Sequence, residues 1–210
     1  MALPSVQFSA DQCNASGTST TLPSAMWDRL HLVDRLSQRR KAEPVTTPRS
    51  RTYEWSDPLT TAAGVGRLSG IDMMNSMSSG ELPPPPIMQT LGIESFEASA
   101  EGRAVFTMRA QEFHYNPLGT VHGGVLSTIM DSATGCAVHT TLPAGWGYTS
   151  LDLTSKFLRA VTVDSGLLRC EGSVISRGRT TALAEARLYD GAGKLVAYAS
   201  SSCLIFEIPT

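Results

Sequence analysis

The chain has 210 residues, of which 41% are hydrophobic and 17% charged, and its formal net charge is −2. This composition excludes a disordered chain and a charge-rich coiled coil, and it shows no excess of Lys and Arg that would indicate a nucleic-acid partner. No apolar run reaches the ~20 residues of a membrane-spanning helix. The first ten residues lack the basic start of a secretory signal. Four isolated cysteines indicate reduced thiols in a cytoplasmic protein and no metal site.

The first fifty residues differ in composition from the rest. They are rich in Ser, Thr, Ala and Asn, and prolines interrupt their charged end. Such a segment predicts a largely disordered tail over residues 1–50, with one short helix near residues 26–36. Residues 51–210 are then expected to form the folded domain.

The domain is expected to begin with a helix and a proline-rich lead-in over residues 59–86. Ser69 stands three residues before Asp72, which predicts a helix that begins there and ends at Gly80. The run of four prolines at 83–86 predicts an extended spacer between two apolar segments.

The remaining segments predict one long helix and six strands. Alternating residues indicate a hairpin of strands 93–100 and 103–110, and the longer period of 123–141 indicates a helix. Further strands are expected at 148–158, 167–176, 180–189 and 195–206, the last two joined by a turn at 190–193. This order predicts an α+β fold with an antiparallel sheet against one helix.

The long helix carries one carboxylate, Asp131, on the face opposite its apolar side. Its neighbours on that face are uncharged: Ser127, Thr134, Gly135 and Val138. A surface helix normally shows charges there, so we expect a partner subunit or a ligand to cover this face. Asp131 is then either a capping or ion-pairing residue, or a catalytic base or nucleophile.

The helix begins at a glycine pair in His122-Gly123-Gly124. Glycines leave the N–H groups of the first turn unshielded, so this helix start is suited to bind an oxyanion. A plain loop-to-helix turn is the alternative reading of the glycines.

Together these residues resemble a known family. Asn116, the His122-Gly123-Gly124 triplet and Asp131 are similar to those of hotdog-fold acyl-CoA thioesterases of the PaaI-like (phenylacetate-pathway) type. The resemblance covers residues 52–208. It implies a curved antiparallel sheet wrapped around the long helix, assembled as a homodimer or a dimer of dimers. It also implies an acyl-CoA substrate and no separate cofactor or metal, because coenzyme A is part of the substrate.

The resemblance also implies roles for individual residues. The Gly123 N–H would polarise the thioester carbonyl, and Asp131 would act as general base or attack directly. Asn116 would orient the water or the thioester, Ser150 would hold the water or Asp131, and His122 would buttress the loop.

A second set of residues is implied to bind the nucleotide part of coenzyme A. Arg177 and Arg179, which flank Gly178, would meet its phosphates. The alternative for these three residues is a solvated hairpin turn.

Two rival enzyme classes do not fit the sequence. Enoyl-CoA hydratases of this fold need an Asp five residues before the His, where this chain has Pro117, and no GxSxG nucleophile elbow is present. A non-catalytic acyl-CoA binding or sensing protein of the same fold stays open, although a buried carboxylate favours an enzyme.

The helix spacing bears on how the site is assembled. Eight residues separate Gly123 from Asp131, which is about 12 Å along a helix. We therefore expect each site to combine Asn116 and Gly123 of one chain with Asp131 and Ser150 of a second.

Overall fold

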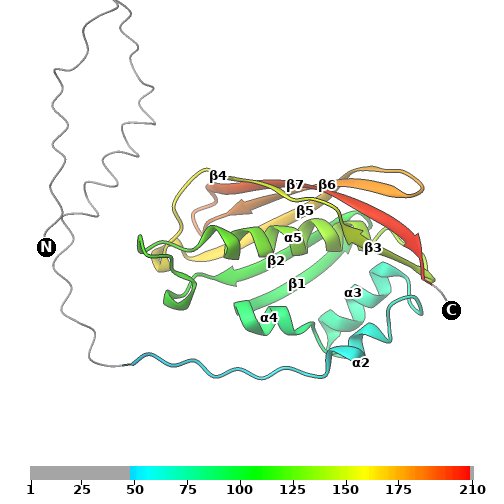
Figure 1. Cartoon of the computed structure of the whole chain (residues 1–210), viewed down its shortest axis with the longest axis horizontal. Coiled ribbons are helices and arrows are strands. Elements are labelled where there is room, and N and C mark those ends of the chain that lie inside the picture. The colour runs from blue at the N-terminus through cyan, green and yellow to red at the C-terminus, as the bar shows by residue number, and fades with distance from the viewer. Residues whose placement is uncertain (1–47, 209–210) are drawn as a thin grey trace, which may run out of the picture. The chain divides into compact units, whose positions relative to one another are not determined.

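A curved antiparallel sheet wraps around one long helix, α5, which spans Gly123–His139 (Figure 1). The computed structural model describes residues 48–208, and residues from Ser50 onward form one unit. The α+β class and the curved sheet around a single long helix are confirmed. The predicted tail, with its short helix at 26–36, lies outside the described residues except for residues 48–50. Within residues 48–208 no helix combines the length and apolarity needed to cross a bilayer.

Within the described part of the chain, the sheet has seven strands. They follow the order β1-β2-β5-β6-β7-β3, and β4 pairs with the other half of β7. The bounds are β1 Ile93–Ala100, β2 Arg103–Arg109, β3 Trp146–Ser150, β4 Thr154–Phe157, β5 Leu167–Arg177, β6 Thr181–Tyr189 and β7 Leu195–Glu207. The hairpins β1–β2, β5–β6 and β6–β7 stand where the sequence predicted them.

Helix α5 packs on the concave face of the sheet and supplies much of the core. Its buried apolar side chains contact β2, β5, β6 and β7, and include Leu126, Ile129, Met130, Ala133 and Ala137. Burying a side chain the size of Leu, Ile or Met contributes roughly 1.5–3 kcal/mol. The helix ends at His139, two residues before the predicted end, where Thr140 Oγ1 donates to the Ala137 carbonyl at 2.7 Å.

Small residues let this helix approach the sheet at backbone distance. Ala182, Ala184 and Ala186 of β6 are buried on the concave face. On β5, a Cβ at Gly172 would lie 2.1 Å from the Ala133 carbonyl oxygen of α5. The helix thus packs so close to the sheet that β6 faces it with alanines and β5 faces it with a glycine.

Among residues 48–208, three short helices precede the sheet: α2 (Pro58–Ala62), α3 (Gly70–Ser79) and α4 (Pro86–Leu91). The predicted caps of α3 are confirmed, because Ser69 Oγ accepts from the Asp72 N–H and Gly80 ends the helix with φ +85°. The sequence reading did not identify α2, which Asp57 caps by accepting from the Leu59 N–H at 2.9 Å.

The proline run is extended only in part. Pro83–Pro85 precede a helix, and Pro86 is the first residue of α4, so the prediction of a four-residue extended spacer was wrong at its last position. Proline suits the first helical position because it lacks only an N–H that would have no helical partner. Arg51 fixes the other end of α4 by donating to the carbonyls of Thr90 (2.6 Å) and Gln89 (2.5 Å).

The predicted single strand over 148–158 is two strands. The chain leaves the ladder at residues 151–153 between β3 and β4, and both strands pair with β7. At the break, the Asp152 carboxylate accepts from the Ser202 N–H at 3.0 Å, and the Asp152 carbonyl accepts from Ser201 Oγ at 2.7 Å. A side chain therefore replaces one backbone ladder contact, which alternation of residues does not reveal.

The close approach at Gly172 gives a stability prediction. Gly172→Ala places a methyl group against the α5 backbone, so we expect it to lower the free energy of unfolding by about 3 kcal/mol, the upper range for overpacked cores. Gly178→Ala is the matched control, because its Cβ would meet nothing closer than 3.4 Å. Urea unfolding of both variants checks this. Equal stability of the two variants would show that the helix shifts freely over the sheet.

Candidate active site

The structure brings Asp131 and Ser150 together. Asp131 lies on α5 and is half-buried, and Ser150 is the last residue of β3. Ser150 Oγ donates to Asp131 Oδ1 at 3.1 Å. The carboxylate singled out from the sequence is thus held by the serine that the family resemblance implied, and its second oxygen is left for another donor.

The helix face that carries Asp131 is covered mainly by the chain's own strands. Thr134, Gly135 and Val138 are buried, and Ser127 Oγ donates to Ser155 Oγ of β4 at 3.2 Å. The expectation that a partner or ligand covers this whole face was wrong, because the sheet curls far enough for β3, β4 and β7 to reach it. Part of α5 stays accessible along Gly124, Thr128, Asp131 and Ser132, here named the open stripe.

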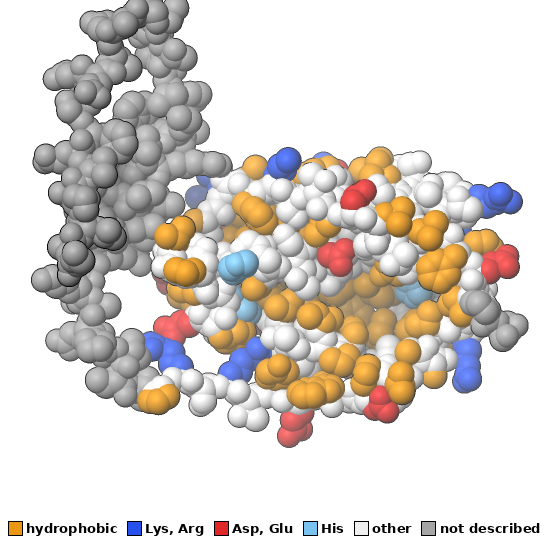
Figure 2. All heavy atoms as spheres, in the orientation of Figure 1, with side chains coloured by type: hydrophobic (Ala, Val, Ile, Leu, Met, Phe, Trp, Pro, Cys, Tyr) orange, Lys and Arg blue, Asp and Glu red, His pale blue; other side chains and the backbone are white. Residues whose placement is uncertain are grey.

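A cavity of about 210 Å³ lies beside Asp131. Both ends of the sheet reach it, since Phe96 and Phe106 come from β1 and β2 and Ser150 from β3. Its opposite wall is made by α3 and α4, with Met74, Met77 and Met88. Figure 2 shows the face of the molecule that is hollowed, with hydrophobic side chains in and around the hollow.

A thiol and a phenol line this cavity together with the Asp131 carboxyl group. Burial raises the pKa of the Cys136 thiol to about 12 and raises the pKa of Tyr148 well above its usual value. Tyr148 fits against the helix because Gly135 has no side chain: a Cβ there would lie 2.7 Å from the Tyr148 hydroxyl oxygen. Of the residues that line the cavity, Asp131 is the one with a carboxyl side chain, and none is a Lys, Arg or His. The sequence reading treated Cys136 and Tyr148 only as core and strand residues.

The start of α5 is arranged as an exposed donor site. His122 is the N-cap, and its Nδ1 accepts from the Gly124 N–H at 2.9 Å, which leaves the proton on Nε2. Among the described residues no acceptor takes the Gly123 N–H. The Phe157 ring lies over Gly123, where a Cβ would come within 3.1 Å of it. Gly123 and Asp131 lie about 12 Å apart on this one helix.

Asn116 shapes the loop that precedes this helix start. Its Oδ1 accepts from the N–H groups of Leu118 (2.9 Å) and Thr120 (3.3 Å), and its Nδ2 donates to Thr120 Oγ1 at 3.1 Å. The amide thus closes a turn within its own loop. Its predicted role in orienting a water or a thioester stays a prediction.

The arginine pair lies at the turn from β5 to β6. Arg177, Gly178 and Arg179 are exposed, and the Gly178 N–H donates to the Thr181 carbonyl at 2.8 Å. Within residues 48–208 neither arginine forms an ion pair with a carboxylate. Arg177 pairs with Ala182, Ala182 with Cys203 and Cys203 with Ser150, so three strand spacings, about 14 Å, separate Arg177 from Ser150.

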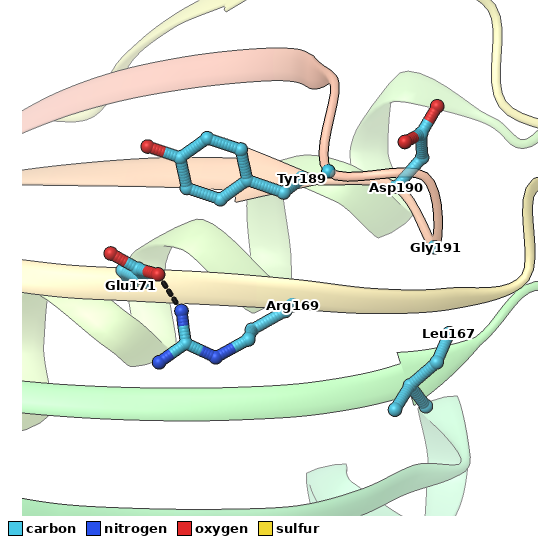
Figure 3. Close-up of a pocket in the computed structure, with 7 residues that line it drawn as sticks. Leu167, Arg169, Glu171, Tyr189, Asp190 and Gly191 are labelled. Atoms are coloured by element: carbon cyan, nitrogen blue, oxygen red, sulfur yellow. Dashed lines mark ion pairs between the residues drawn. The ribbon is translucent and has the colours of Figure 1, made fainter.

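A second hollow, of about 420 Å³, lies on the convex face of the sheet (Figure 3). It is lined by outward-facing residues of β5 and β6 and by the turn after β6. Its Arg169 and Glu171 pair with each other, and the Asp190 carboxylate accepts from the N–H groups of Ala192 and Lys194. The charged groups of this hollow are thus already partnered, and the sheet separates it from Asp131.

Histidines and metal ligands add no second site. His114 is buried, with Nε2 bonded to the Leu91 carbonyl at 2.8 Å, and His139 is buried against Tyr148, so both pack in the core. In the part of the chain that the structure describes, no three His, Cys, Asp or Glu side chains gather as metal ligands would.

Comparison with known proteins identifies the family. Residues 118–197 match the thioesterase superfamily. A Pseudomonas aeruginosa protein assigned provisionally as an esterase is 32% identical over 124 residues, which are 59% of this chain and 89% of that protein. The chain belongs to the thioesterase superfamily. Its fold is the hotdog fold, and thioester hydrolysis is the activity that this membership assigns to it.

Two further relatives agree with this membership. Human acyl-coenzyme A thioesterase 13 is 27% identical over 110 residues, covering 52% of this chain and 77% of the human protein. A Ralstonia eutropha structure, provisionally named a thioesterase and related to phenylacetic acid degradation, is 33% identical with a TM-score of 0.57. The match covers 62% of this chain and 98% of that one.

The burial of His139 beneath the site predicts a pH effect on stability. Burial lowers the pKa of His139, so below about pH 6.5 the unfolded chain binds a proton that the folded chain does not. The free energy of unfolding should therefore fall as the pH drops below 6.5. Because the Nδ1 atom of His139 is buried without a hydrogen-bond partner among residues 48–208, His139→Leu should remove part of this loss.

Urea unfolding at pH 7.5 and pH 5.0 measures the effect. The free energy of unfolding should fall further in the wild type than in His139→Leu, because only the wild type has this buried imidazole with a lowered pKa. His114 has a pKa lowered in the same way and maintains some dependence in both proteins. An identical fall in the two proteins would exclude His139 as its source.

Proposed function

We propose that this thioesterase hydrolyses acyl-CoA esters to a free acid and coenzyme A, with Asp131 at the centre of the reaction. The observation that carries the proposal is the Ser150–Asp131 hydrogen bond at the mouth of an apolar cavity. A carboxylate held by one donor, with apolar space next to it, is suited to act on a thioester whose acyl part is apolar. The names of the human and Ralstonia relatives point in the same direction.

Asp131 acts on the thioester either as a general base or as a nucleophile. As a general base it takes a proton from water while the hydroxyl oxygen bonds to the thioester carbonyl carbon. As a nucleophile it bonds to that carbon itself, and water then hydrolyses the resulting anhydride. In both, the C–S bond breaks and coenzyme A leaves as a thiolate that takes up a proton. Ser150 orients the carboxylate, and the Gly123 N–H stabilises the negative charge on the carbonyl oxygen.

The geometry supports a site shared between two chains. A carbonyl bound at the Gly123 N–H is about 12 Å from Asp131 of the same helix, and reaction needs contact near 3 Å. Exposed apolar side chains flank both places: Phe157 lies over Gly123, and Leu151 is next to Ser150. A two-fold dimer that covers the open stripe would bring Gly123 of each chain to Asp131 of the other, giving two sites.

The nucleotide of coenzyme A is proposed to bind at Arg177 and Arg179. Neither guanidinium is paired with a carboxylate of the described chain, and both are exposed. Guanidinium groups bind phosphate oxygens in bidentate geometry. The Gly178 backbone between them leaves room for a phosphate to approach both side chains.

Removal of the carboxylate tests the proposal. Asp131→Asn should lower kcat by a factor of about 10³ because the asparagine side chain is neither a base nor a nucleophile, and general-base catalysis contributes 10²–10⁴. Free thiol release from acetyl-, octanoyl- and palmitoyl-CoA measures the rate. Asp164→Asn is the control, since Asp164 is an exposed carboxylate of the short turn Val163–Ser165.

Two results would contradict the proposed function. If Asp131→Asn retained the wild-type rate, Asp131 would not be the reacting group. If no CoA ester released thiol with the wild-type protein, the chain would be an acyl-CoA binding protein.

A further inference from the structure

We propose that the cavity beside Asp131 binds the acyl group and restricts it to uncharged, apolar acyl groups of up to about eight carbons. This inference rests on the proposed function, because it takes Asp131 as the position of the thioester carbonyl. It assigns substrate selection to α3 and α4, which precede the residues 118–197 that match the superfamily.

The direction of the acyl group follows from how the cavity walls differ. Asp131 and Ser150 stand at one end. Met74 and Met77 of α3 and Met88 of α4 form the wall contributed by these two helices. A carbonyl at the polar end therefore leaves the hydrocarbon part of the substrate to contact methionine and phenylalanine side chains.

The volume of the cavity limits the length of the acyl group. An apolar protein cavity of about 150 Å³ binds benzene, or about 25 Å³ per carbon. The 210 Å³ beside Asp131 thus accommodates about eight carbons, as a straight chain or as an aromatic ring with a short linker. A sixteen-carbon chain needs twice that space and would have to displace α3 or α4.

The residues that line the cavity determine whether it accepts a charged acyl group. No Lys, Arg or His lines the cavity, and its one carboxyl side chain is Asp131 at the polar end. A carboxylate at the far end of an acyl chain would be buried among methionines without a cation. Esters of dicarboxylic acids are therefore rejected, even when their length fits.

Met77 is suited to test the wall because it is only half-buried, so its truncation leaves the core intact. Met73, which is 4% exposed, provides the control on the same helix, and thermal unfolding must show that its variant is folded. It does not line the cavity, and its methyl group is 4.0 Å from where a Cβ at Gly64 would be. Ile87, at the start of α4, lines the cavity and is 42% exposed, so a larger side chain fits there without strain in the core.

The first experiment compares substrates with the full-length wild-type protein. We expect kcat/KM for thiol release to rise from acetyl- to octanoyl-CoA and to fall at least tenfold by palmitoyl-CoA. Octanoyl-CoA should exceed suberoyl-CoA, which has the same eight carbons and a terminal carboxylate, at least 100-fold. Equal values for octanoyl- and suberoyl-CoA, or a maximum at palmitoyl-CoA, would overturn the inference.

The second experiment changes the wall in both directions. Met77→Ala should move the preferred chain length upward by about two carbons, Ile87→Trp should move it downward, and Met73→Ala should leave it unchanged. Thermal unfolding shows that each variant is folded. An unchanged preference in both folded wall variants, or the same shift in Met73→Ala, would show that this wall does not contact the acyl group.

Binding separates failure of this inference from failure of the proposed function. S-octyl-CoA and S-(7-carboxyheptyl)-CoA are thioethers without a carbonyl group for a thioesterase to attack, and calorimetry measures their Kd values. A tenfold or greater preference for S-octyl-CoA supports the cavity assignment even if no ester is hydrolysed. Equal Kd values would reject the assignment even if esters are hydrolysed.

Discussion

The structure depends on how closely the sheet encloses helix α5. At Gly172 the helix and strand backbones approach within the space of a missing methyl group, and at Gly135 the Tyr148 hydroxyl takes the place of a side chain. This enclosure buries nine of the seventeen residues of the helix. The open stripe stays accessible, and Asp131 is its one carboxyl residue.

The same enclosure creates the cavity. Because the sheet curls around α5, its two end strands approach each other across the open stripe, and α3 and α4 close the space from the side of β1. Asp131 therefore stands between a hydrogen-bond donor from β3 and an apolar wall from the preceding helices. A carboxylate in such a position is available to a bound ester while its surroundings favour an apolar acyl group.

Local signals in the sequence predicted the elements well. The caps at Ser69 and Gly80 and the start of α5 at Gly123 depend on residues within one turn, and the structure confirms them. The break between β3 and β4 was missed because it depends on Asp152 meeting Ser202, fifty residues away. The covering of the helix face was misjudged for a related reason: period and polarity do not show how far a sheet will curl.

The sequence likewise predicted some residues of the candidate site and missed others. Asp131 stood out as a lone carboxylate, and the family resemblance added Ser150, which the structure places within hydrogen-bond distance. The amide of Asn116 bonds within its own loop, and its role toward the substrate stays a prediction. The methionine wall has no sequence signature of its own, because Met74, Met77 and Met88 read as ordinary core residues until α3 and α4 are placed beside α5.

A subunit-mixing assay tests most directly whether the reaction needs two chains. Gly123→Pro removes the N–H at the first helical position, where proline is tolerated, and Asp131→Ala removes the carboxylate. Each protein alone should be inactive in thiol release from octanoyl-CoA. After subunit exchange, about half of the dimers contain one chain of each kind and should regain one working site, so activity returns to about a quarter of the wild-type rate. A mixture that exchanges subunits and stays inactive would show that each site lies within a single chain.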